Sequence, residues 1–425
     1  MSKNKNNSHN ITRRQFLGYS GAGILGTALV KPAFAKSSDP HVKPETGMRY
    51  RRLGRTNYMV SEIGLGCASG SLSRQLGRFL FAKWLHERGE VANKLLDLGG
   101  NFVSTSTFYH NTVELITKGL KGREDEYYFA IGIIPQGKKR ILKHFDKARK
   151  DMNKDVIDLV FSHGSGTEEG FEVFHKLKDE GKIKWVGMSS HDPREHEWAM
   201  RKDYLDWMHI PYNRLSRIKQ GTADLPGVER ILRLAKEKDV GTIGIKPLTG
   251  NFIPYWAKQT SNTEVQEIMK RLKDYGPQNL YQAMLKWNLQ NPNLHACAVG
   301  MDTVQQVVEN VEGIKSRNIS SVQQELLEQY AGLADKDYCR MCETCTPHCP
   351  KGIPIPDVLR FKMYYQNYGW GNHAQDLYNE LPDDKKAVNC DKCGICEEHC
   401  PNRLAITDKL YEAHNILNKN SSLAV

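Results

Sequence analysis

The chain has 425 residues, of which 39% are hydrophobic and 26% charged, a balance typical of a globular protein with one large and one smaller domain. This composition excludes a disordered or fibrous protein. The formal net charge is +11, but residues 1–35 hold five basic and no acidic residues, so the remainder has 55 basic against 49 acidic residues, or +6. No basic run interleaved with aromatics follows, so we expect no nucleic-acid partner.

The first 35 residues have the pattern of an export signal. A basic, polar start leads into TRRQFL, then an apolar run over 16–30, then the small-x-small site Ala33-Phe34-Ala35. That run is too short and too rich in glycine for a membrane span. It resembles a twin-arginine signal, whose route exports folded proteins. We therefore predict a periplasmic or extracytoplasmic protein, with a disordered basic tail or an uncleaved anchor as the alternatives.

Over residues 48–334, short β-rich apolar runs alternate with amphipathic helical segments, which is typical of a parallel α/β fold. Eight such runs over about 270 residues predict a (β/α)8 TIM barrel, whose active site lies at the carboxyl ends of the strands. An open doubly wound sheet is the alternative, but no GxGxxG motif follows the first run. The predicted strands are 61–67, 101–106, 127–134, 156–163, 183–190, 206–213, 240–248 and 295–301.

Residues 335–425 contain the pattern Cys-x2-Cys-x2-Cys-x3-Cys-Pro twice. Three closely spaced thiolates and a fourth before proline are typical of paired 4Fe-4S clusters, in which the fourth cysteine ligates the other cluster. Structural zinc would need neither the third cysteine nor the proline, and disulfides are the other alternative in an exported protein. We assign Cys339, Cys342, Cys345 and Cys400 to one predicted cluster, and Cys390, Cys393, Cys396 and Cys349 to the other.

The two cysteine motifs are separated by 40 residues, from Cys349 to Cys390, more than a compact bacterial ferredoxin needs. A helical segment lies between them. Residues 335–425 therefore resemble the helical dicluster ferredoxin domains that accompany respiratory enzymes, and we predict a small, mainly helical second domain. The aromatic residues of the segment are either an electron relay or core and interface residues of that helix: Tyr364, Tyr365, Tyr368 and Trp370.

Segments spread over residues 48–316 resemble the aldo/keto reductases in sequence and order. The resemblance implies a TIM barrel, oxidoreductase chemistry on a small molecule, and NADP(H) as a possible cofactor. In that family a tetrad of Asp, Tyr, Lys and His reduces carbonyls, with Tyr protonating the oxygen while NADPH delivers hydride. The segments are MRYRRLGRTNYMVSEIGLGC, LDLGGNFVSTSTFY, VIDLVFSHG, LKDEGKIKWVGMSSH, IPYNRLSR, KPLTG and VGMDTVQQVVENV.

Two members of that tetrad are missing here. Matched by motif, the Asp and Lys positions hold Ser104 and Gly132, whereas the Tyr and His positions hold Tyr109 and His163. A phenol with a reference pKa near 10 is a poor proton shuttle at neutral pH unless a neighbouring cation lowers that pKa. The resemblance therefore implies Tyr109 and His163 as candidate proton donors, with badly slowed hydride chemistry. Inherited packing is their alternative role.

The nicotinamide site of the family is altered as well. Ser189 and Ser190 match the carboxamide-binding turn, but His209 stands where glutamine is usual. The stretch that normally grips the 2′-phosphate contains Asp302, which would repel that phosphate. Cys67, at the top of the first strand, either faces the site or is a small buried hydrophobe.

The predicted clusters, the incomplete tetrad and the export signal together predict an exported iron-sulfur oxidoreductase that no longer uses NADPH. Electrons would pass through the two clusters between a redox partner protein or quinone-linked donor and a small molecule at the barrel top. Membrane association would then arise only through a partner or an uncleaved signal. The alternatives are a non-catalytic electron-transfer subunit with a scaffold barrel, and an NADPH-dependent carbonyl reductase with an accessory ferredoxin domain.

Overall fold

The computed structural model describes most of the chain beyond residue 44. The predicted export signal over 1–35, the domain boundary at 335 and Trp370 lie outside the described residues. No helix within the described part is long and apolar enough to cross a bilayer. The described residues are 41–42, 45–67, 88–107, 109, 111–135, 137–164, 166–214, 227–248, 277–334, 338–368 and 371–418, with isolated positions between 263 and 274.

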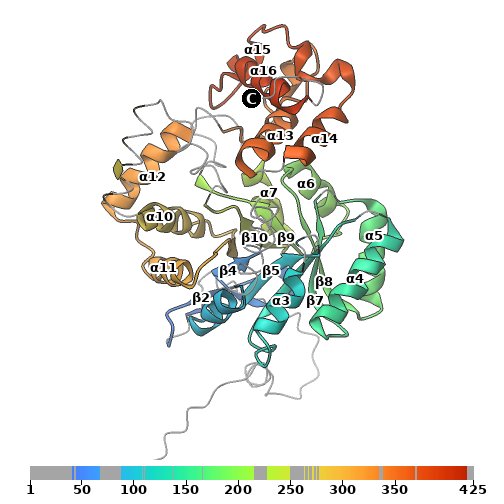
Figure 1. The fold of residues 1–425 in the computed structure, drawn as a ribbon, viewed down its shortest axis with the longest axis vertical. Helices are drawn as coiled ribbons and strands as arrows, with labels where there is room; N and C mark the ends of the chain where they lie inside the picture. The colour runs from blue at the N-terminus through green and yellow to red at the C-terminus, as the bar shows by residue number, and fades with distance from the viewer. Residues whose placement is uncertain are drawn as a thin grey trace, which may run out of the picture.

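The eight predicted strands form a closed parallel barrel in the order β10-β11-β4-β5-β6-β7-β8-β9 (Figure 1). This arrangement confirms the predicted TIM barrel. The observed strands are shorter than the predicted runs, because the runs include residues of the loops at each end. They are β4 Ile63–Gly66, β5 Phe102–Ser106, β6 Tyr128–Ile133, β7 Ile157–His163, β8 Ile183–Ser189, β9 Trp207–Pro211, β10 Gly241–Ile245 and β11 Ala296–Val299.

A small antiparallel sheet precedes the barrel, with β1 His41–Val42, β2 Arg49–Arg52 and β3 Met59–Ser61. The fully buried Glu62 follows this sheet at the amino end of β4. Its carboxylate forms ion pairs with Arg49, Arg51 and Arg317 at 3.0, 2.8 and 2.6 Å. Several arginines around one buried carboxylate satisfy its charge, so this end of the barrel is a structural ion-pair cluster.

Amphipathic helices cover the strands. Helix α5 is an example. Thr167 is its N-cap and accepts a hydrogen bond from the Gly170 N–H at 3.1 Å, whereas Phe171 and Phe174 face the core. The helices around the barrel are α3 Thr112–Gly119, α4 Lys138–Met152, α5 Glu168–Asp179, α6 Pro193–Arg201, α7 Val228–Glu237, α10 Pro277–Leu289, α11 Val304–Lys315 and α12 Ser321–Ala334.

The region after residue 338 is mainly helical and has a hydrophobic core of its own, as the sequence predicts. It lies over the ends of α6 and α7 in Figure 1, at the end of the barrel where the parallel strands finish. Its elements are η4 Thr346–His348, α13 Ile355–Tyr368, α14 Gly371–Asn379, η5 Asp383–Lys385, η6 Ala387–Asn389, α15 Ile395–Glu398 and α16 Ile406–Leu417.

Candidate functional site

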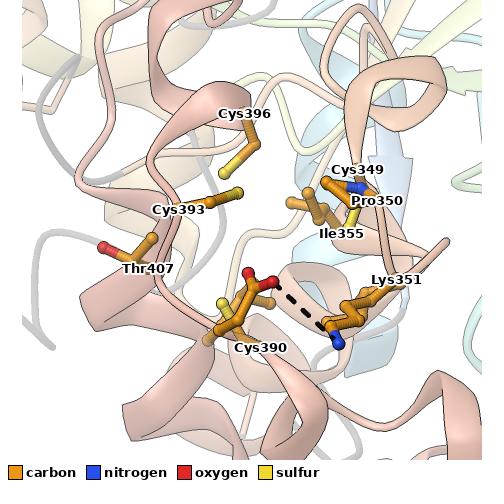
Figure 2. Close-up of a pocket in the computed structure, with 11 residues that line it drawn as sticks. Cys349, Pro350, Lys351, Ile355, Cys390, Cys393, Cys396 and Thr407 are labelled. Carbon is orange, nitrogen blue, oxygen red and sulfur yellow. Dashed lines mark ion pairs between the residues drawn. The ribbon is translucent and has the colours of Figure 1, made fainter.

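Four cysteines line one pocket of the helical region, and we call them the distal thiol set. Cys390 and Cys393 precede α15 and Cys396 lies within it, and Cys349 lies opposite them after η4 (Figure 2). The pocket is also lined by apolar side chains, including Leu410. Four soft sulfur donors around an apolar pocket fit the ligation of a 4Fe-4S cluster.

The other four cysteines, Cys339, Cys342, Cys345 and Cys400, form the proximal thiol set. Burial, and then the neighbouring thiols of the set, raise the pKa of Cys339 above its ordinary value. The pKa of Cys345 rises to about 12 for the same reasons. The Met341 N–H donates to the Cys339 sulfur at 3.5 Å. The structure thus brings together the two groups that the sequence assigned, and their role as ligands stays a prediction.

Two histidines between the thiol sets were not singled out from the sequence. The rings of His348 and His399 stack with centroids 3.6 Å apart and planes 18° apart. Each directly precedes the last cysteine of its motif, Cys349 or Cys400, so the HCP repeat was the available signal. Within the described ranges, no group of three or more His, Cys, Asp or Glu side chains is arranged to hold a single metal ion.

Tyr109 and His163 meet at the carboxyl end of the barrel strands. The Tyr109 hydroxyl lies 3.5 Å from His163 Nε2, and the two rings are 82° apart. Burial raises the pKa of Tyr109 above its ordinary value. Burial, helped by the charge of Lys246, lowers the pKa of His163 to about 4. At neutral pH the pair is therefore a protonated phenol beside a neutral imidazole.

A phenylalanine fills the space next to Gly132, where the resemblance expects the tetrad lysine. A Cβ atom at Gly132 would lie 2.6 Å from two ring atoms of Phe161 and 3.0 Å from the Ser106 Cβ. Ser104, at the Asp position, is buried, and its carbonyl accepts the Cys67 N–H at 2.9 Å. The position of the missing lysine is therefore not empty, because the Phe161 ring packs over Gly132.

The turn after β8 uses one of the two predicted cofactor-binding serines for local structure. The Ser190 hydroxyl accepts the Asp192 N–H at 3.0 Å and donates to the Glu195 carboxylate. Ser189 ends β8, and its carbonyl accepts the Gly164 N–H at 2.9 Å. The hydroxyl of Ser190 thus stabilises the start of α6.

His209 is buried inside the barrel rather than at its mouth. It is 2% exposed and contacts the rings of Phe161 and Trp207, at centroid distances of 4.7 and 4.9 Å. Burial lowers its pKa to about 3, so the ring is neutral. In the described part of the chain, its Nε2 has no hydrogen-bond partner. These surroundings are those of a core residue.

The expected repulsion of a 2′-phosphate by Asp302 is offset. The guanidinium of Arg88, which is 1% exposed, pairs with the Asp302 carboxylate and donates to the Met301 carbonyl. Cys67 is also buried here, and burial raises its pKa to about 11. The Cys67 thiol is close enough to Tyr109 to raise the pKa of that phenol, so it is both buried and next to the site.

Lys246 is a site residue that the sequence analysis missed. It directly follows β10, is half-buried, and has the left-handed φ of 54°. Burial lowers its pKa to about 7. A lysine at the end of an apolar barrel strand was the available signal, because the carboxyl ends of these strands carry the active sites of TIM barrels.

Two contacts join the helical region to the top of the barrel. Tyr338, which directly precedes Cys339, forms a side-chain hydrogen bond with Asn213, and Asn213 Nδ2 donates to the Lys246 carbonyl at 3.2 Å. The Tyr364 hydroxyl on α13 lies 2.5 Å from Nδ1 of His191, which follows β8. The proximal thiol set therefore adjoins the barrel top, and Tyr364 is an interface residue.

An ion-pair network surrounds these contacts. Arg194 at the start of α6 pairs with Asp192 at 2.5 Å and reaches Glu343 and Asp357 of the helical region at 2.7 and 3.1 Å. Arg360 of α13 lies 3.4 Å from the same Asp192. The neighbouring carboxylates raise the pKa of Arg194 and keep its charge fixed. Opposite charges thus hold the two parts together.

Comparisons with known proteins match the two parts separately. The family model described as "Aldo/keto reductase family" matches residues 85–330, and the model described as "4Fe-4S dicluster domain" matches residues 338–406. L-galactose dehydrogenase of Arabidopsis thaliana is 24% identical over 326 residues, which are 68% of this chain and 95% of that protein.

The helical region has a relative of its own. One of the subunits of the H(2):CoB-CoM heterodisulfide,ferredoxin reductase of Methanothermobacter thermautotrophicus is 32% identical over 113 residues, 27% of this chain and 56% of that protein. Among solved structures, the aldo/keto reductase of Klebsiella pneumoniae in complex with NADP and acetate has a TM-score of 0.51 and 18% identity, covering 66% of this chain and 95% of that one. This likeness shows the shared barrel fold.

Proposed function

Since the chain belongs to the aldo/keto reductase family and is an oxidoreductase, we propose that it is an exported iron-sulfur enzyme whose barrel acts on a small molecule without NADPH. The proximal and distal thiol sets would each hold a 4Fe-4S cluster, which supplies one-electron transfer when bound. The external electron donor or acceptor is a redox partner protein or a quinone-linked donor. The protein would be associated with a membrane only through that partner or an uncleaved signal.

The contact between the proximal thiol set and the barrel top is the observation that carries this proposal. Tyr338, the residue before Cys339, hydrogen bonds with Asn213, whose side chain in turn donates to the Lys246 carbonyl at the ends of the barrel strands. An electron-transfer domain that took no part in a reaction at the barrel would need no such contact with the mouth of the barrel. The proximity supports a reaction at the barrel top that uses electrons from the helical region.

The distal thiol set is the side that a partner can reach. Cys393 is exposed, and two of the most exposed apolar side chains of the described residues lie in the same region, Val388 at 60% and Tyr411 at 59%. Lys392 lies over the Tyr411 ring at 5.2 Å. Exposed apolar side chains with a charged rim are typical of transient protein interfaces. We place the redox partner here.

Tyr109 and His163 transfer the proton in this proposal, with Tyr109 as its donor. The Tyr109 phenol keeps its proton at neutral pH because burial raises its pKa, and the neutral His163 accepts or relays a proton at 3.5 Å. The reaction class that this arrangement fits is proton-coupled reduction or oxidation of a small carbonyl or alcohol. Export through the twin-arginine route would allow cluster insertion before translocation.

The NADPH-dependent alternative is favoured by one observation. Buried Arg88 supplies a cation beside Asp302, in the stretch that binds the 2′-phosphate in the family, and the Klebsiella relative is a complex with NADP. Against it stand the repacking of Phe161 over Gly132 and the local hydrogen bonds of Ser190. The two functions therefore differ in whether NADPH binds and is consumed.

The test starts from the full chain, purified and reconstituted without oxygen. Iron and sulfide analysis with EPR spectroscopy would count the clusters, and extraction would identify any other bound cofactor. We expect two clusters, and no binding of NADPH in a calorimetric titration. Tight NADPH binding together with reduction of a carbonyl compound would overturn the proposal in favour of the alternative.

A further inference from the structure

Lys246 has a strained backbone that its neighbours hold in place. A lysine rarely adopts a φ of 54°, and strain of this kind is typical of functional positions. Asn213 Nδ2 donates to the Lys246 carbonyl at 3.2 Å, and Nδ2 of the buried Asn288 donates to the Pro247 carbonyl at 3.0 Å. The surroundings therefore fix this conformation at the carboxyl end of β10, where a TIM barrel places reacting groups.

The charge of Lys246 acts on two imidazoles at the barrel top. Burial is the main reason that the pKa values of His163 and His191 are lowered, and the Lys246 charge lowers both further. Burial also lowers the pKa of Lys246 to about 7. At neutral pH the amine is therefore divided between charged and neutral forms, the condition under which a group transfers protons efficiently.

Lys246 supplies a cation in place of the tetrad lysine, whose position in β6 is held by Gly132. The Phe161 ring occupies the space beside Gly132, so a cation cannot enter the site from that strand without moving the ring. Lys246 enters instead from β10, and its charge reaches His163, which contacts Tyr109. A positive charge therefore acts on His163, one of the two remaining tetrad residues, although it comes from a different strand.

We propose that Lys246 is a catalytic residue whose ammonium binds the reacting oxygen of a small carbonyl substrate and of the alkoxide formed from it. This inference rests on the proposed function. In the reducing direction the carbonyl gains two electrons from the external redox partner protein and two protons. One ammonium N–H bond breaks as the O–H bond of the alcohol forms, and the Tyr109 O–H bond breaks as the C–H bond forms. Solvent then reprotonates the neutral amine and the Tyr109 phenolate.

The helical region completes the wall of this site. The Tyr364 hydroxyl on α13 forms a 2.5 Å hydrogen bond with His191 Nδ1 and so positions this imidazole. The charge of Lys246 lowers the pKa of the same imidazole. A ligand at Lys246 would therefore sit at the junction of the two parts. Among the described residues, the titratable or charged side chains that face these imidazoles from the surrounding elements are Tyr109, His196, His209, Lys246, Arg360 and Tyr364.

Calorimetric titration of the reconstituted full chain with acetate, a small stable oxyanion, tests this proposal. Acetate should bind at pH 6, where Lys246 is charged, and at least about tenfold more weakly at pH 9. Lys246→Met should lose at least about tenfold in affinity at pH 6, because the cation is gone. Lys246→Arg should bind acetate at both pH values, because arginine stays charged.

Lys286→Met is the matched control, since Lys286 is a buried lysine that hydrogen bonds with Gln323 and the Asn318 carbonyl outside the site. It should bind acetate as the unmodified chain does. Thermal unfolding and iron content verify that each variant is folded. Absence of acetate binding in the unmodified chain, equal binding by Lys246→Met, or a pH-independent affinity would each overturn the inference. None of these results affects the NADPH titration, which tests the proposed function separately.

Discussion

The two thiol sets differ in their surroundings, although their sequence motifs are almost the same. In the proximal set no cysteine is exposed, and the residue before Cys339 contacts the barrel. In the distal set, Cys393 is exposed and lies near the exposed side chains of Val388 and Tyr411. An electron route requires one end beside the reacting molecule and one end that a partner can reach. The difference between the sets indicates that the proximal set is the end beside the reacting molecule and the distal set is the end that a partner reaches.

Removing one thiol from either set should have the largest effect of the changes considered, on both bound iron and electron flow. Cys345→Ser and Cys393→Ser should each lose roughly half of the bound iron, because each set loses one of its four thiolates. Both variants should also lose electron flow between a partner protein and the barrel. Iron analysis and EPR spectroscopy of the reconstituted variants measure this, with Cys297→Ala in β11 as the control that keeps its iron. Full iron retention in either serine variant would contradict the assignment.

Changes at the barrel top should leave the clusters intact and remove the reaction. Tyr109→Phe and His163→Ala should slow substrate turnover roughly 100-fold or more, because each removes a positioned proton donor or acceptor. Steady-state rates, once a substrate is identified, measure this beside unchanged iron content. Unaltered physiological electron flux in both variants would instead support a scaffold barrel.

Restoring the family lysine should destabilise the barrel without recovering NADPH-dependent activity. Gly132→Lys places a Cβ against the Phe161 ring and should cost about 1–3 kcal/mol of unfolding free energy. Chemical denaturation measures the loss, and NADPH oxidation with carbonyl compounds measures activity. The double variant Gly132→Lys, Phe161→Ala separates the clash from the charge. A gain of NADPH-dependent activity in the single variant would contradict the repacking argument.

Lys246 should carry a stability cost that depends on pH. Its folded-state pKa of about 7 lies below the ordinary 10.5, so the folded chain binds fewer protons than the unfolded chain between these values. The free energy of unfolding therefore decreases as the pH falls from about 10.5 to about 7. Below pH 7 it decreases no further on this account, because Lys246 is then protonated in both states. Lys246→Met should raise stability at neutral pH by about 1 kcal/mol and have no advantage near pH 10.5.

Denaturant unfolding of Lys246→Met and of the unmodified chain at pH 6.5, 8.5 and 10 checks this sign. Lys246→Arg is the matched variant, because it keeps a charge at all three pH values and should not gain stability. A stability difference that stays constant across the pH range would rule out the predicted linkage.

The smallest effect is expected at the ion pairs between the two parts. Arg194→Ala should weaken the interface by about 1 kcal/mol, because the Arg194 side chain is about half exposed and its pairs are partly screened. The loss should shrink at high salt. Limited proteolysis between residues 330 and 340, at low and high ionic strength, measures opening of the interface. Arg201→Ala, which removes an exposed pair with Glu197 within α6, is the control and should leave cleavage unchanged.

Most of the fold was predictable because it depends on local patterns. Each barrel strand is a short apolar run followed by an amphipathic helix, so all eight were located to within a few residues. The repeated cysteine spacing likewise predicted which thiols lie together, because a fixed motif positions three of them and the proline directs the fourth. Both signals are contained in short stretches of the chain.

The contacts at the barrel top could not be predicted in this way. Phe161 packs over Gly132 from a neighbouring strand, and Tyr364 reaches His191 across 173 positions of sequence. Such contacts depend on how the two parts dock and on side-chain rotamers, which no local pattern encodes. The sequence therefore indicates that the tetrad lysine is missing, but not that the charge of Lys246 acts on His163.

The most direct test of the central claim is an EPR spectrum of the reconstituted chain after anaerobic addition of NADPH and, separately, of a reduced ferredoxin. We expect NADPH to leave both clusters oxidised and the ferredoxin to reduce both. Cluster reduction by NADPH, or its consumption with a carbonyl compound, would contradict the account and return the barrel to the nicotinamide chemistry of its family.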